Sequence, residues 1–185
     1  MNNTLKMHEL NFDPYPVIET ERLLLRKVSM DDAEDVFLLR TNEAAMKYIN
    51  KPKLLSIDDA KELIKKMNEP DRIQWGITLP TDNKIIGTIG YHKIDKDHYR
   101  AEIGYMLHPD HWNTGMMSEA ITKVIDHGFN KMQLHSIEAT INPGNDASRN
   151  LLKKFSFIKE AYFKEKFFFE GKFFDNEVYS LVKKP

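Results

Sequence analysis

The sequence predicts a mixed α/β (α+β) fold in which helices flank one central sheet. Consecutive strand-like runs are joined by the short polar turns TDNK and DKDH, a spacing typical of antiparallel hairpins. A strand, a helix and another strand follow between residues 99 and 141. Hairpins combined with a strand–helix–strand unit indicate a single sheet of mixed direction.

The chain begins with a polar arm and a first strand. Residues 1–16 contain Pro14 and Pro16 as breakers, and the apolar run ERLLLRKV at 21–28 reads as a strand. We expect residues 17–185 to form a single domain, because the chain is long enough to bury one core and has no repeat, low-complexity segment or internal linker.

Two helices are expected after this strand. Ser29 stands three residues before Asp32, a spacing typical of a capping box, and apolar residues follow at helical spacing as far as Ala44. Ser56 begins the same pattern ahead of a second helix, which reaches Met67. The rest of the chain contains both strands and helices. Strands are expected around 75–79, 85–94, 99–107, 136–141, 161–170 and 172–182. Helices are expected after Gly115 and after the loop NPGNDAS.

Composition excludes several classes of function. The net charge is −1, so the chain lacks the basic excess that nucleic-acid binding usually requires. It has no cysteine, which excludes a disulfide framework, a thiolate metal site and a cysteine nucleophile. No apolar run has the length of a membrane span or a signal-peptide core. We therefore expect a cytoplasmic protein without membrane or direct nucleic-acid contact.

The stretch HPDHWNTGMMSEA, residues 108–120, is the first candidate site. Asn113, Thr114 and Gly115 lie where a helix is expected to begin. A helix start leaves N–H groups free and carries the positive end of the dipole, so it binds phosphate readily, and glycine lets a ligand approach the backbone. An ordinary helix cap with a flexible residue is the other interpretation, and this stretch alone favours it.

Four polar residues elsewhere are further candidates. Glu102 lies in mid-strand, on the face opposite Tyr105, where a carboxylate near a cleft accepts a proton; a solvated outer face is the simpler interpretation. Asn142, Asn145 and Ser148 lie in the loop and first turn of the last helix and can hydrogen-bond a ligand. Alternatively, Asn145 or Asp146 only caps that helix.

Two further patterns point away from a ligand site. His108 and His111 are three residues apart, but Pro109 interrupts a helix there and no third ligand lies nearby, so no metal is expected. The phenylalanines after residue 160 recur at strand spacing, which favours a core or a dimer surface over a platform for stacking bases. The protein is expected to be a monomer or a homodimer.

Three motifs in order resemble the Gcn5-related N-acetyltransferase (GNAT) family over roughly residues 18–182. The first, ETERLLLRKVSMDDAEDVFLL, is similar to the family's T-x-R-L-x-L-R start followed by a capped helix. The second, AEIGYMLHPDHWNTGMMSEAI, is similar to its E-I-G-Y strand, W-x-x-G and E-A. The third, IEATINPGNDASRNLLKKFSF, is similar to its Asn-rich loop, serine and L-x-K-x-G-F. Within the family, the RimJ/RimL-type ribosomal-protein N-terminal acetyltransferases are most similar.

The resemblance implies a mostly antiparallel sheet with a V-shaped opening between two parallel strands, RAEIGYML and SIEATI, where acetyl-coenzyme A binds. Backbone groups of Tyr105, Met106 and Leu107 would pair with the pantetheine arm. The loop of Trp112, Asn113, Thr114, Gly115, Met116 and Met117 would hold the pyrophosphate.

The same resemblance implies roles for the polar candidates. Asn142 or Asn145 would help to fix the pantetheine and the incoming amine, Glu102 would act as a base or position the amine, and Ser148 would lie near the departing sulfur. Two positions depart from the family pattern. Met117 replaces a small residue, and Ser156 replaces the glycine before Phe157.

The implied reaction is direct acetyl transfer from acetyl-coenzyme A to a primary amine, without a covalent enzyme intermediate or a metal. An α-amine with a pKa near ~8 is roughly one-tenth neutral at pH 7, whereas a lysine amine is neutral far less often. This slightly favours a protein N-terminus, such as that of a ribosomal protein. The alternatives are a small amine (an antibiotic, a polyamine or an amino-acid derivative) and a coenzyme A-binding module without turnover.

Overall fold

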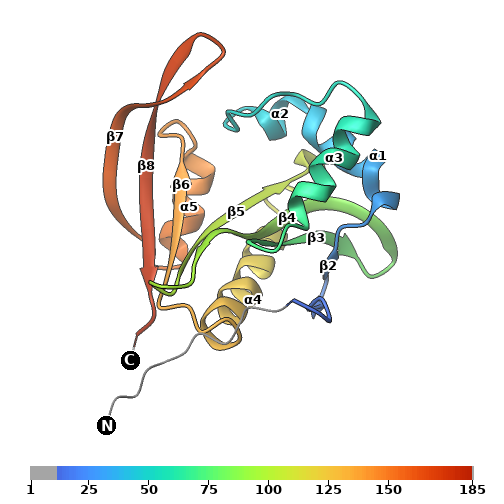
Figure 1. Cartoon of the computed structure of the whole chain (residues 1–185), viewed down its shortest axis with the longest axis horizontal. Helices are drawn as coiled ribbons and strands as arrows, with labels where there is room; N and C mark the ends of the chain where they lie inside the picture. The colour runs from blue at the N-terminus through green and yellow to red at the C-terminus, as the bar shows by residue number, and fades with distance from the viewer. Residues whose placement is uncertain (1–11, 185) are drawn as a thin grey trace.

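The computed structural model describes residues 12–184 and has one eight-stranded sheet in the order β1-β2-β3-β4-β5-β6-β8-β7 (Figure 1). The strands are β1 (Ile18–Glu19), β2 (Leu24–Lys27), β3 (Ile73–Leu79), β4 (Asp82–Asp95), β5 (Arg100–Leu107), β6 (Ser136–Ile141), β7 (Ile158–Phe169) and β8 (Lys172–Val182). Every neighbouring pair is antiparallel except β5 and β6. The predicted mixed α/β class is therefore confirmed.

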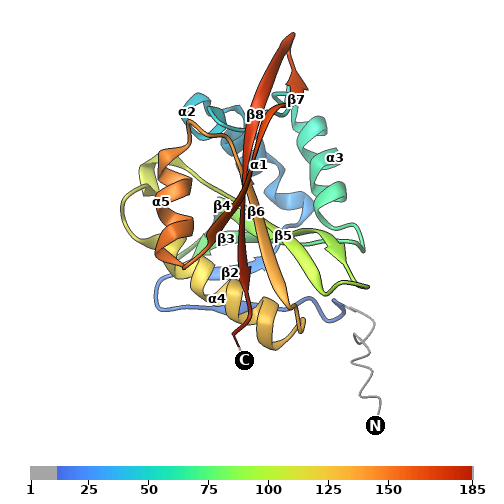
Figure 2. The same ribbon diagram turned by 90° about the vertical axis from the view of Figure 1, so that its left-hand side faces the viewer.

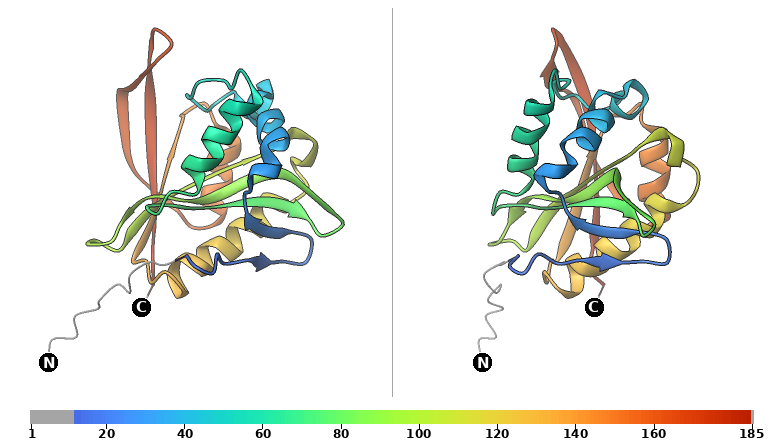
Figure 3. Two further views of the ribbon diagram at one scale, coloured as in Figure 1. Left: turned by 45° about the vertical axis from the view of Figure 1, so that its right-hand side comes forward. Right: turned by 90° about the vertical axis from the view of Figure 1, so that its right-hand side faces the viewer.

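Helices cover both faces of this sheet (Figures 2 and 3). They are α1 (Ala33–Thr41), α2 (Glu43–Met46), α3 (Ile57–Met67), α4 (Met116–Asn130) and α5 (Asp146–Lys154), with short 3-10 turns η1 (Met30–Asp32) and η2 (Pro109–His111). Helices α1 and α3 pack together on one face, while α4 and α5 lie on the other. The β7–β8 hairpin extends beyond the body of the molecule.

The centre of the sheet is buried because its strands carry apolar side chains on both faces. Trp75 in β3 and Tyr91 in β4 are fully buried, and the Tyr91 hydroxyl donates a hydrogen bond of 2.8 Å to the Val124 carbonyl in α4. A satisfied hydroxyl lets this large ring lie inside the core without an unpaired polar group. The sheet is thereby fixed to the helix that follows the predicted anion loop.

The first predicted helix is broken into two. It was expected to continue to Ala44, but α1 ends at Thr41 and Asn42 adopts an extended backbone with φ −65° and ψ 118°. The Asn42 side chain accepts a hydrogen bond of 3.0 Å from the Ala45 N–H and so caps α2. Asparagine competes for backbone partners in this way, which favours a new helix start over continuation.

Part of the expected N-terminal arm packs on the sheet. Residues 1–11 lie outside the described residues. The Tyr15 hydroxyl donates to the Gln74 carbonyl at 2.8 Å, and Trp75 Nε1 donates to the Pro16 carbonyl at 2.7 Å. Burial raises the pKa of Tyr15 well above its usual value, although the bond to Gln74 lowers it. The predicted first strand begins later, at Leu24, after the short β1.

None of the helices in residues 12–184 combines the length and the apolar character that a membrane crossing requires.

Candidate active site

The two parallel strands β5 and β6 pair only at their beginnings. Their register runs from Arg100 opposite Ser136 to Glu102 opposite Glu138 and stops there. Beyond this point β5 stays paired with β4 as far as Leu107, and β6 stays paired with β8 as far as Ile141. The carboxyl halves of β5 and β6 therefore diverge, and the predicted V-shaped split is confirmed (Figure 1).

A cleft of about 700 Å³ occupies the open end of this split. Most of the residues predicted to bind the co-substrate line it, namely Tyr105, Met106, Leu107, Trp112, Asn113, Gly115, Met117, Asn145 and Ser148. Helix α2 and the residues after it contribute Ala44, Ala45, Lys47, Tyr48 and Ile49, which the sequence patterns did not single out. This segment begins directly after the helix break at Asn42.

The loop before α4 presents free backbone donors to the cleft. Gly115 adopts φ 83° and precedes the first residue of α4, and Asn113 also has a left-handed backbone with φ 61°. Within residues 12–184, no side-chain cap hydrogen bond is made at the start of α4. Two side-chain hydrogen bonds hold the loop: Thr114 Oγ1 donates to the His111 carbonyl at 2.7 Å, and Trp112 Nε1 donates to the Leu107 carbonyl at 2.8 Å. These groups fit an anion.

A tyrosine and a serine face each other across the cleft. The hydroxyl groups of Tyr105 in β5 and Ser148 in α5 are 2.7 Å apart. Burial raises the pKa of Tyr105 to about 12, even though the hydrogen bond with Ser148 lowers it. The pair therefore stays protonated at neutral pH, and it can donate a proton or a hydrogen bond to a ligand atom in the cleft.

Comparison with known proteins identifies this arrangement. The family model "Acetyltransferase (GNAT) domain" matches residues 22–158. The chain belongs to the GNAT family of N-acetyltransferases. It is 38% identical over 173 residues to the uncharacterized N-acetyltransferase YoaA of Bacillus subtilis, with 91% of this chain and 98% of that protein covered. The uncharacterized N-acetyltransferase p20 of Bacillus licheniformis is 35% identical, with 89% and 95% covered.

A solved GNAT acetyltransferase from Bacillus anthracis superposes with a TM-score of 0.80 and 30% identity, covering 90% of this chain and 98% of that one. The protein is thus an N-acetyltransferase of the GNAT type, and enzymes of this family use acetyl-coenzyme A as the acetyl donor. The uncapped loop and the cleft between β5 and β6 are the features of this chain that fit that co-substrate.

The Asn-rich loop of this GNAT chain is held by its own side chains. Asn142 Oδ1 accepts from the Gly144 N–H at 2.9 Å, and Asn145 Oδ1 caps α5 by accepting from the Ser148 N–H at 3.1 Å. Asn145 therefore caps α5, as the alternative interpretation of the sequence predicted. Asn142 does not line the cleft in this arrangement.

Arg149 and Glu177 support this loop, and the sequence patterns did not reveal them. The Arg149 guanidinium donates to the Pro143 carbonyl and pairs with Asp146, and its Nε lies 3.2 Å from the buried Glu177 carboxylate. Burial raises the pKa of Glu177, but hydrogen bonds from Lys159, Tyr179 and Arg149 outweigh this and lower it. The ion pair joins residues 28 positions apart, so no local motif could have indicated it.

Glu102 lies at the closed end of the V, on the last paired position of β5, and does not line the cleft. Lys93 Nζ is 2.6 Å from its Oε2, and His92 Nε2 is 3.5 Å from its Oε1. Burial raises its pKa, but the hydrogen bonds and charges of His92 and Lys93 prevail and lower it to about 2. The group is therefore an ionised carboxylate at neutral pH and a weak base.

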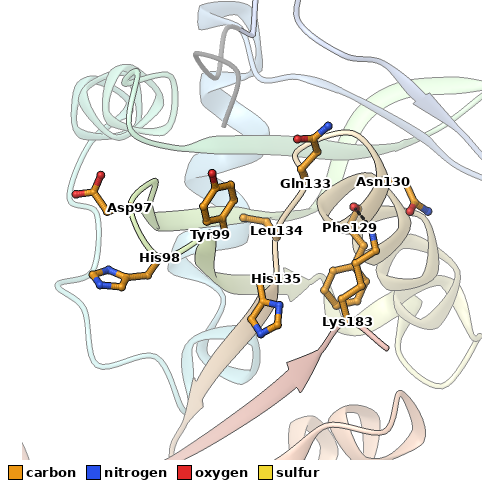
Figure 4. Close-up of a pocket in the computed structure, with 9 residues that line it drawn as sticks. All are labelled: Asp97, His98, Tyr99, Phe129, Asn130, Gln133, Leu134, His135 and Lys183. Carbon is orange, nitrogen blue, oxygen red and sulfur yellow. Dashed lines mark hydrogen bonds between the residues drawn. The ribbon is translucent and has the colours of Figure 1, made fainter. Parts of the chain in front are cut away.

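A second cavity, of about 660 Å³, lies at the other end of the same two strands (Figure 4). Tyr99 and His135, which precede β5 and β6, line it, and Lys183 Nζ donates to the Phe129 carbonyl at 2.8 Å at its edge. Because the strands pair closely at this end, the cavity does not open into the V. No cluster of three or more potential metal-binding side chains occurs in the described part of the chain.

Proposed function

We propose that this GNAT enzyme acetylates the N-terminal α-amine of a protein, as RimJ/RimL-type ribosomal-protein acetyltransferases do. The observation that carries the proposal is the cleft between β5 and β6, which ends at the uncapped start of α4. In this proposal residues 17–185 act as one catalytic domain, which meets its substrate in the cytoplasm as a monomer or homodimer.

The co-substrate would lie along β5. Beyond Glu102 the edge of β5 that faces away from β4 has no strand partner in the described residues, so the free backbone groups of the segment from Tyr105 to Leu107 are suited to pair with the amide groups of pantetheine, although the Leu107 carbonyl already accepts from Trp112 Nε1. The loop from Trp112 to Met117 would hold the pyrophosphate on its N–H groups. Met117 lines the cleft, and its flexible side chain is able to move aside for a ligand.

In the proposed reaction the enzyme holds a neutral amine against the thioester carbonyl. The amine nitrogen forms a bond to the carbonyl carbon, the carbon–sulfur bond breaks and its electron pair leaves with the sulfur. The nitrogen releases one proton through solvent to the thiolate, which gives the amide and coenzyme A. Backbone N–H groups near Met106 or Leu107 would stabilise the oxyanion. Ser148, hydrogen-bonded to Tyr105, would donate a hydrogen bond to the departing sulfur. Asn142 would help to place the amine indirectly, because it holds Gly144, which lines the cleft.

Glu102, which lies at the closed end of the V and pairs with Lys93, would act on the amine from a distance, through its charge. A carboxyl with a pKa of about 2 removes a proton from an ammonium poorly, but it attracts and orients one. An α-amine has a substantial neutral fraction at pH 7 and needs no strong base. The weak basicity of Glu102 therefore fits an α-amine better than an acceptor that must be deprotonated by the enzyme.

Two relatives illustrate the two acceptor classes. The [Ribosomal protein uS5]-alanine N-acetyltransferase of Escherichia coli is 29% identical over 89 residues, which cover 48% of this chain. The spermidine N(1)-acetyltransferase of Vibrio cholerae is 24% identical over 141 residues, which cover 76% of this chain. A polyamine is therefore the second candidate acceptor.

An acceptor panel tests the proposal. Coenzyme A release is measured with peptides that carry free N-termini, with the same peptides blocked at the N-terminus, and with spermidine. We expect turnover with free N-termini and none with the blocked peptides. Preference for spermidine, or equal turnover with blocked peptides that contain lysine, would contradict the α-amine assignment while leaving the enzyme class intact.

A further inference from the structure

Thr20 and Arg22, from the opening T-x-R-L-x-L-R motif, contact the first turn of α4, about a hundred positions away in the chain. The Thr20 hydroxyl donates to Glu119 Oε1, and the Arg22 backbone N–H donates to the same oxygen at 2.9 Å. Arg22 Nε donates to Glu119 Oε2 at 2.7 Å. Thr20 and Arg22 thus donate hydrogen bonds to both carboxylate oxygens of Glu119.

The same guanidinium also reaches the loop before α4. Arg22 Nη1 donates to the Thr114 carbonyl at 3.0 Å. A Cβ placed on Gly115 would lie 3.4 Å from Arg22 Nη2, so this amino group lies beside the glycine. Within residues 12–184, Nη2 donates no hydrogen bond to the protein, and the Arg22 side chain is 43% exposed. The planar guanidinium therefore joins Glu119 to the Thr114–Gly115 peptide and keeps free donors on the loop side.

The contact between Arg22 and Glu119 bears on phosphate binding because of the charge of Glu119. A carboxylate in the first turn of a helix is favoured by the helix dipole, but it repels a phosphate that binds at the same turn. Burial raises the pKa of Glu119, and the bonds from Thr20 and Arg22 overcome this and lower it, so the group is ionised. Without Arg22, a negative charge would stand unpaired beside the loop.

We propose that Arg22 is the positioning residue of the pyrophosphate loop: it neutralises Glu119, fixes the Thr114–Gly115 peptide and leaves Nη2 for a phosphate oxygen. This inference rests on the proposed pyrophosphate site. It assigns a role to a motif that lies outside the acetyl-transfer machinery. Arg26, the second arginine of that motif, has a different function, because it pairs with Asp32 at 2.7 Å and joins β2 to the start of α1.

Paired titrations with coenzyme A and with pantetheine test the proposal, because only coenzyme A carries the phosphates. Losing a charge-assisted contact and exposing Glu119 should weaken coenzyme A binding to Arg22→Gln by about tenfold to a hundredfold. Pantetheine affinity should change less than about twofold, since its contacts are to β5. In the double variant with Glu119→Gln, part of the lost affinity should return because the repulsion is gone.

Arg72→Gln is the matched control. Arg72 is also a partly exposed arginine with two carboxylate partners, Glu69 at 3.1 Å and Asp71 at 3.2 Å, but it lies in the turn before β3. Its ratio of coenzyme A to pantetheine affinity should equal that of the unmodified protein. The melting temperature of each variant without ligand separates a general loss of stability from a loss of phosphate binding.

Equal losses for both ligands, or no loss for either, would overturn the inference. If Arg22→Gln fails to fold, Arg22→Lys keeps the charge but cannot contact Glu119 and Thr114 together, and the same selective loss is expected there. Failure of the unmodified protein to bind coenzyme A would instead contradict the proposed function, so the two failures are distinguishable.

Discussion

Replacing Glu102 by glutamine removes a charge that the structure holds ionised at the closed end of the V. Glutamine keeps the shape of the side chain and can still hydrogen-bond, so the change isolates the charge. Burial raises the pKa of Glu102, but His92 and Lys93 lower it from 4.5 to about 2. The same carboxyl in the unfolded chain has lost these partners.

The stability attached to this charge follows from the two pKa values. A carboxyl whose pKa falls from 4.5 to about 2 contributes at most about 3 kcal/mol to the free energy of unfolding at neutral pH. The Lys93 side chain is 73% exposed, and solvent screening reduces the effect to about 1–2 kcal/mol. Because the folded-state pKa is lowered, this contribution is complete above pH 4.5 and is lost as the pH falls towards about 2.

Urea denaturation of the unmodified protein and Glu102→Gln, at about pH 7 and again at about pH 3, measures this contribution. We expect the variant to be less stable by about 1–2 kcal/mol at neutral pH and the difference to shrink in acid. Glu138→Gln is the control. Glu138 lies on the neighbouring strand and also has a basic partner, the half-exposed Arg100 at 3.2 Å, but it is itself more exposed than Glu102. A difference for Glu102→Gln that is the same at both pH values would refute the electrostatic argument.

Three other substitutions test separate parts of the structure. Ser156 has φ 63°, so Ser156→Gly should relieve a left-handed backbone and raise the free energy of unfolding by about 1 kcal/mol, seen as a higher melting temperature. Tyr105→Phe removes the 2.7 Å contact with Ser148 and should cost about 1 kcal/mol in urea unfolding while lowering turnover more than coenzyme A binding. In Gly87→Ala the new Cβ would lie 2.6 Å from the Met106 carbonyl oxygen, so β5 must shift. The free energy of unfolding should fall by about 2–3 kcal/mol, and calorimetric titration should show weaker coenzyme A binding.

Local signals in the sequence predicted much of the fold. The Ser56–Asp59 capping box is present, with the Ser56 N–H donating to Asp59 at 3.0 Å and the Asp59 N–H to Ser56 at 3.2 Å. The turn signals between strands also predicted the hairpins correctly. The break at Asn42 was missed because apolar spacing continues across it, and only the side-chain cap reveals a new helix.

Long-range ion pairs could not be predicted in this way. Arg22 and Glu119 are 97 positions apart, and Arg149 and Glu177 are 28 apart. Both pairs depend on the strand order, which brings distant segments together, and no spacing in the chain encodes that proximity. The motifs indicated which residues surround the cleft, whereas the charges that support its loops required the folded structure.

The loop before α4 is the proposed pyrophosphate site, and a calorimetric titration with acetyl-coenzyme A tests this assignment. Acetyl-pantetheine, which lacks the phosphates, and the variant Gly115→Glu, which adds bulk and negative charge beside Arg22, complete the experiment. We predict that acetyl-coenzyme A binds much more tightly than acetyl-pantetheine and that Gly115→Glu removes this difference. Equal affinity for the two ligands, or undiminished binding to Gly115→Glu, would show that the pyrophosphate binds elsewhere.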